Sequence, residues 1–92
     1  MSEPVITVDF TIDETRPSTP YLISIWVDSD SINREREREL LGTKRKFVEE
    51  WFASQGWQAG SDYIVDLDRF VSIDWYFFRT KSMAMVFKLA VA

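Results

Sequence analysis

Alternation of apolar and polar residues marks the first two segments of the chain. Between residues 5 and 13 every second residue is apolar, a pattern typical of a strand with one buried face and one wet face. Residues 21–27 repeat the pattern, with Leu22 and Trp26 on the face opposite to Tyr21, Ile23, Ile25 and Val27. The intervening segment holds Pro17 and Pro20, which disfavour regular structure. We therefore expect two strands joined by a loop.

A helical period follows from Ile32 to Gln55. Its strongest part is an apolar stripe made of Leu40, Leu41, Phe47, Val48, Trp51 and Phe52. Residues 28–31 offer several N-cap side chains before this segment, and Gly56 stands where a helix commonly ends. The spacing also predicts helical ion pairs between Arg36 and Glu39 and between Arg45 and Glu49.

Gly42 raises an alternative start for this helix. Glycine in a helix interior costs about 1 kcal/mol relative to alanine, so the helix could instead begin near Thr43. Such a start would place three basic residues, 44–46, at the positive end of the helix dipole, which is unfavourable. We favour one long helix.

The C-terminal part carries two apolar runs, 70–78 and 83–91, separated by the polar residues 79–82. One face of the first run would hold Val71, Ile73, Trp75 and Phe77, and one face of the second would hold Met83, Met85, Phe87, Leu89 and Val91. Two such runs around a short polar gap are typical of a β-hairpin. Residues 63–67 add a further short strand.

These elements predict an α+β fold, with a single antiparallel sheet of four or five strands and one long helix packed on one face, in the order ββαβββ. The chain, 1–92, is long enough for one domain. One helix covers only one face of the sheet. The other face would carry Leu22, Trp26, Phe70, Ser72, Asp74, Tyr76 and Phe78. Exposed aromatic surface of this kind usually marks a contact site.

The composition limits the chemistry available to the chain. It is 46% apolar and 28% charged, as expected of a globular domain, and it contains neither histidine nor cysteine. The commonest general base and the commonest metal ligands are therefore missing. The three glycines are scattered, so no phosphate-binding loop is expected. We predict a protein that is not an enzyme and that has no cofactor and no metal.

Acidic residues also have plain structural interpretations. Asp28 and Asp30 are interpreted as helix caps, and Asp66 and Asp68 as turn residues, rather than as cation ligands. Asp74, between Ile73 and Trp75, is interpreted as a charge that points outward from its strand.

Charge is distributed unevenly along the chain. The net charge is −4, yet residues 34–46 carry six bases and three acids. An acidic body with one basic segment disfavours nucleic acid as a partner and leaves contacts with proteins open. No apolar run approaches the roughly 20 residues that span a bilayer, and the N-terminus shows no secretory signal. We expect a cytoplasmic protein without membrane contact.

Two segments carry a resemblance to known proteins. Gln55-Gly-Trp-Gln-Ala-Gly-Ser-Asp-Tyr63 and the stretch from Tyr76 to Leu89 resemble parts of small uncharacterised proteins encoded by tailed phages. The resemblance implies a stand-alone small protein that acts by binding, in the cytoplasm of the host. It implies no site residues.

The leading hypothesis is a phage-encoded, non-enzymatic protein-interaction module that binds a host or viral protein through its aromatic sheet face, as a monomer or as a homodimer. Its expected apolar anchors are Trp26, Phe70, Tyr76 and Phe78, and its expected steering charges are Arg34, Arg36, Arg38, Lys44 and Arg45. One alternative is a structural accessory subunit of a virion. Another is a binder of single-stranded nucleic acid, with the rings of residues 70, 76 and 78 as a stacking platform.

Overall fold

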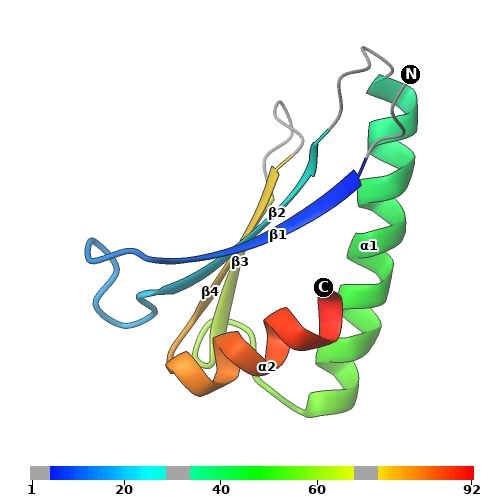
Figure 1. The fold of residues 1–92 in the computed structure, drawn as a ribbon. Coiled ribbons are helices and arrows are strands. Elements are labelled where there is room, and N and C mark those ends of the chain that lie inside the picture. The colour runs from blue at the N-terminus through cyan, green and yellow to red at the C-terminus, as the bar shows by residue number, and fades with distance from the viewer. Residues whose placement is uncertain (1–4, 29–33, 68–72) are drawn as a thin grey trace.

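The computed structural model describes residues 5–28, 34–67 and 73–92, which form a sheet covered on one side by two helices (Figure 1). Strands β1 (Val5–Ile12), β2 (Tyr21–Asp28), β3 (Tyr63–Leu67) and β4 (Ile73–Phe78) form one antiparallel sheet in the order β1-β2-β4-β3. Helices α1 (Arg34–Gln55) and α2 (Lys81–Val91) pack on the same face. The predicted α+β fold with a four-stranded antiparallel sheet is confirmed.

The C-terminal segment is a helix, so the predicted hairpin is wrong and the element order is ββαββα. Thr80 caps α2, because its Oγ1 accepts a hydrogen bond from the backbone N–H of Met83 at 3.1 Å. The buried face of α2 consists of Ala84, Phe87 and Val91, at helical spacing. Leu89, which the predicted strand placed on its inward stripe, is 82% exposed.

Strand β4 has the opposite phase to the predicted one. Ile23 of β2 lies opposite Tyr76, and Ile25 lies opposite Asp74, so residues 74, 76 and 78 face the helices. Tyr76 is 2% exposed and Phe78 is fully buried. The expectation that Asp74 points outward is also wrong, because this carboxylate is buried against α1. The predicted phase of β4 placed the charge of Asp74 on the outer face, whereas this charge lies in the interior.

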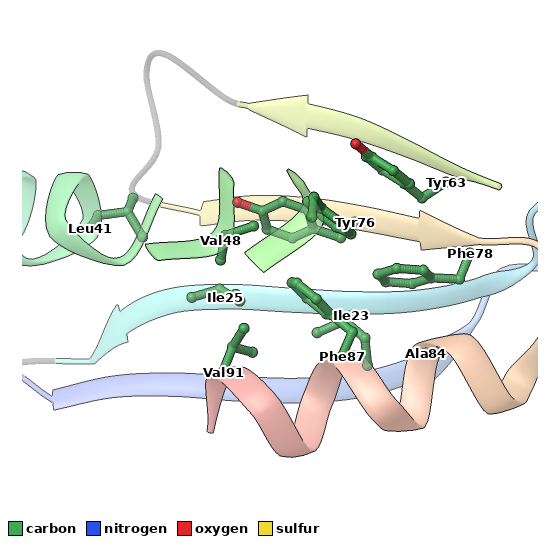
Figure 2. Close-up of a cluster of buried hydrophobic side chains, with 11 residues drawn as sticks. Ile23, Ile25, Leu41, Val48, Tyr63, Tyr76, Phe78, Ala84, Phe87 and Val91 are labelled. Atoms are coloured by element: carbon green, nitrogen blue, oxygen red, sulfur yellow. The ribbon is translucent and has the colours of Figure 1, made fainter. Parts of the chain in front are cut away.

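The core lies between the sheet and the two helices. Figure 2 shows side chains of β2 and β4 facing residues of α1 and α2, among them Ile23, Phe78, Val48 and Phe87. Phe52 of α1 stacks on Tyr63 with ring centroids 3.9 Å apart and on Phe87 at 5.2 Å. Such ring contacts add to the stabilisation that comes from the area these residues bury.

Helix α1 is continuous through Gly42, which confirms the long helix over the start near Thr43. It ends before Gly56, whose φ of +72° lies in the left-handed region that glycine adopts without strain. The predicted ion pair between Arg36 and Glu39 is present at 3.2 Å. Arg45, which the sequence spacing pairs with Glu49, instead binds Asp74.

Candidate functional site: an open sheet face and a cleft

The sheet face opposite the helices is called the open sheet face below. The strand register arranges its side chains in three rows across the sheet. The first row is Thr11, Leu22, Phe77 and Ile64, the second is Asp9, Ser24, Trp75 and Asp66, and the third is Thr7, Trp26 and Ile73. Apart from Ser24, the side chains on the two central strands are thus apolar, and the acidic ones lie on the edge strands β1 and β3.

The loop between β1 and β2 covers one end of the open sheet face. The guanidinium of Arg16 lies 3.9 Å from the ring centroid of Phe77, a cation–π contact. Arg16 also lies 3.8 Å from the carboxylate of Asp13. Phe77 is consequently buried, whereas Trp26 and Trp75 are only half-buried.

A second feature is a cleft of about 420 Å³ on the helical side, between α1 and strands β3 and β4. Its walls are mostly apolar and aromatic, and they include Phe52, Trp57 and Tyr63. Val65 and Leu67 of β3 also line it and are 40% and 42% exposed. Cavities of this size, lined by apolar side chains with a few polar groups, are typical of binding sites.

The polar end of the cleft is formed by the partly exposed Arg45, which pairs with the buried carboxylate of Asp74. Arg45 of α1 donates from Nε and Nη2 to the two carboxylate oxygens of Asp74 of β4, at 2.7 and 2.6 Å. These hydrogen bonds raise the pKa of Arg45, and the negative charge of Asp74 adds to the effect. Because the two charges cancel, the carboxylate of Glu49, which also lines the cleft, leaves this end acidic.

Tyr76 contributes a polar atom to the same cleft. Its ring extends from β4 toward Val48 of α1 (Figure 2). Burial raises the pKa of its phenol, with a further contribution from the nearby Asp74 carboxylate. Among the described residues its hydroxyl has no hydrogen-bond partner, and no fully buried polar side-chain atom lacks one. The hydroxyl therefore reaches solvent through the cleft.

The structure separates the predicted apolar anchors. Trp26 lies on the open sheet face as predicted. Tyr76 and Phe78 are core residues, so their prediction as surface anchors is wrong. Phe70 lies outside the described residues. Because Tyr76 and Phe78 are buried, two of the three rings of the stacking platform predicted for nucleic acid are not accessible.

The predicted steering charges also divide. Arg36 and Arg38 are exposed on the first half of α1, and the side chain of Arg34 lies outside the described part of the chain. Lys44 donates its Nζ to the backbone carbonyl of Val91 at 2.7 Å and so ties α2 to α1. Arg45 is committed to Asp74.

Sequence reasoning missed Trp75 on the open sheet face and the pair Val65 and Leu67 beside the cleft. A usable signal for Trp75 was the base at position 45, because it lies on the helix face that carries Val48 and Phe52. An arginine on that face needs an acidic partner on the facing strand. Asp74 can be that partner only if its side chain points toward α1, and the next residue, Trp75, then points to the open sheet face.

Acidic side chains do not gather into a metal site in the part of the chain that the structure describes. Within residues 5–28, 34–67 and 73–92, no three of them come together as a metal ion would need. Asp66 lies within β3, so its predicted turn role is wrong. The predicted roles of Asp28, Asp30 and Asp68 fall on side chains outside the described part. Neither described helix has the length and apolar character that crossing a membrane requires.

Comparison of the chain with protein-family models, with curated proteins and with solved structures found no match.

Proposed function

We propose that this chain is a small, non-enzymatic protein-interaction module that binds another protein through its open sheet face. The observation that carries the proposal is the position of Trp26 and Trp75 in adjacent rows of a face that neither helix covers. Leu22, Ile64 and Ile73 extend the apolar area around them. Tryptophan is among the residues that contribute most to binding energy at protein interfaces.

Charge indicates what kind of partner fits this face. The row that contains Trp75 ends in Asp9 on β1 and Asp66 on β3, so the apolar centre is flanked by acid on both edges. The whole chain is acidic as well, with a net charge of −4. A complementary partner presents an apolar patch bordered by lysine or arginine, which also speeds its association.

The proposed origin of the chain and the proposed class of its partner rest on the sequence resemblance. The similarity of residues 55–63 and 76–89 to small tailed-phage proteins supports a viral source, and the partner is then a host or viral protein. A structural subunit of a virion would use the same open sheet face, with a neighbouring subunit as the partner. Single-stranded nucleic acid fits this face less well, because Asp9 and Asp66 would repel its phosphates.

The proposal is tested by co-precipitation with a matched pair of variants. In Trp26→Ala/Trp75→Ala the open sheet face loses both large rings, while in Leu89→Ala an exposed apolar side chain is removed from α2 on the other side of the sheet. We expect Leu89→Ala to recover the wild-type partner in wild-type amount and the double variant to recover at least tenfold less. Thermal melts establish that both variants fold. Equal recovery by the three proteins would contradict the choice of surface.

A further inference from the structure

Strand β3 is an edge strand whose outward backbone groups lie beside the cleft. The backbone N–H of Arg79 donates to the carbonyl of Asp62 at 3.0 Å, and these residues are opposite each other in the β3–β4 register. Because bonded and non-bonded positions alternate along an antiparallel pair, the backbone groups of Ile64 and Asp66 point toward β4. Those of Tyr63, Val65 and Leu67 point to the open edge.

Of these three positions, Val65 and Leu67 make no backbone hydrogen bond at the edge with any residue that the structure describes. The carbonyl of Tyr63 already accepts a hydrogen bond from Gly60 N–H at 2.7 Å. Val65 and Leu67 each present an N–H donor and a carbonyl acceptor at the spacing that an added strand requires.

The cleft provides space for the side chains of such a strand. Val65 and Leu67 point toward α1 and form one wall, and Glu49 and Ala53 of α1 stand on the opposite wall. Side chains of an added strand alternate between the two faces of the sheet. Every second one would therefore enter the apolar cleft, and the 420 Å³ volume admits more than one aliphatic group.

Two acidic side chains beside the β3 edge favour a partner with basic residues. Glu49 lies on the cleft side of the β3 edge and Asp66 on the open-face side, and neither forms an ion pair with any residue in the described part of the chain. An added strand would thus meet an uncompensated carboxylate on each face. A second copy of β3 would bring two Asp66 residues close together across the junction, which is unfavourable. A segment whose basic side chains lie on the open-face side would neutralise Asp66.

We propose that the β3 edge and the adjacent cleft form a strand-addition site for an extended segment of another protein in which apolar residues alternate with lysine or arginine. The apolar side chains occupy the cleft, and the basic ones lie near Asp66 on the opposite face. This site lies at the β3 edge, shares only Asp66 with the open sheet face, and does not depend on the function proposed for that face.

The test is a titration of the isotopically labelled chain with a synthetic nine-residue peptide of alternating valine and lysine, followed by backbone amide chemical shifts. We expect saturable shifts that include the amides of Val65 and Leu67 in β3 and of Glu49 and Ala53 in α1. A peptide with glutamate in place of lysine should bind at least tenfold more weakly. Absence of saturable shifts, or shifts confined to the open sheet face, would overturn the proposal.

Two variants locate the binding on the edge and on its charge. Val65→Pro removes an N–H that β4 does not use, a substitution that edge strands tolerate, and it should abolish the saturable shifts. Asp66→Lys should weaken binding at least tenfold, while Glu50→Lys, an acid-to-lysine change at an exposed position of α1 outside the cleft, should alter it less than twofold. Equal effects of the two lysine variants would reject the site even if Val65→Pro failed to fold.

Discussion

At the scale of single residues, the ion pair of Asp74 and Arg45 joins β4 to α1. It buries a carboxylate that is 1% exposed and orients it with two short hydrogen bonds from α1. It also sets the phase of β4 and so decides which aromatic rings enter the core. Arg45 itself is 35% exposed, so the two partners differ in their access to water.

Removal of Arg45 and removal of Asp74 should therefore lower the free energy of unfolding by different amounts. Arg45→Ala leaves a buried carboxylate without a counter-charge, and we expect the free energy of unfolding to fall by about 3 kcal/mol. Asp74→Ala leaves a guanidinium that can turn to solvent at the cleft, and we expect a smaller loss of about 1–2 kcal/mol. Urea denaturation of the two variants measures both values. A larger loss for Asp74→Ala would show that the arginine is the less hydrated partner.

Tyr76 should make the fold sensitive to alkali. Its pKa is raised in the folded chain, so the neutral phenol is favoured there relative to the unfolded chain. This contribution is complete below the ordinary tyrosine pKa of about 10 and is lost as the pH rises above it. We expect Tyr76→Phe to lose less stability than the wild type between pH 9 and pH 11.5, as measured by thermal melts. Parallel curves for the two proteins would contradict this role.

At the scale of elements, patterning predicted those with a clear polar face and failed where both faces are apolar. Strands β1 and β2 follow from alternation, and α1 follows from its stripe and from Gly56. The run 83–91 fits a period of 2 and a period of 3.6 equally well, because Phe87 and Val91 belong to both stripes. What decides for a helix is the cap at Thr80, the helix-favouring composition, and the lack of a turn glycine or asparagine in residues 79–82.

The Thr80 cap can be tested by a conservative pair of substitutions. Thr80→Ala removes the hydroxyl that accepts from Met83 N–H, and we expect a loss of about 1 kcal/mol in the free energy of unfolding. Thr80→Ser keeps the hydroxyl and should stay close to the wild type. Chemical denaturation compares the three proteins, and equal stabilities would mean that α2 is held by packing alone.

Two glycines, one inside α1 and one just after it, should respond in opposite directions. At Gly42 no atom lies within 4 Å of the place that an alanine methyl group would take, so Gly42→Ala should stabilise the chain by about 0.5–1 kcal/mol. Gly56 has a positive φ, so Gly56→Ala should destabilise it by about 1 kcal/mol. Thermal melts distinguish the two. A destabilising Gly42→Ala would indicate a requirement at that position that the helix geometry does not show.

At the scale of the whole molecule, both helices lie on one side and the sheet presents the other side to a partner (Figure 1). The single-helix expectation already implied one uncovered face, and Leu22 and Trp26 were placed on it correctly. The part that β4 contributes could not be predicted, because it depends on whether Asp74 points in or out, and that is settled by a contact with a residue 29 positions away in the sequence. The cleft depends on the same contact.

The charges on the open sheet face also determine whether two copies of the chain associate through it. Two such faces placed together would bring four carboxylates, Asp9 and Asp66 of each copy, around the tryptophans, in chains that each carry a net charge of −4. Like charges in such an arrangement repel each other, most strongly at low ionic strength. We therefore expect a monomer by analytical ultracentrifugation in low salt. A dimer that Trp75→Ala dissociates would show that the face is self-complementary, because Trp75 lies in the same row as Asp9 and Asp66.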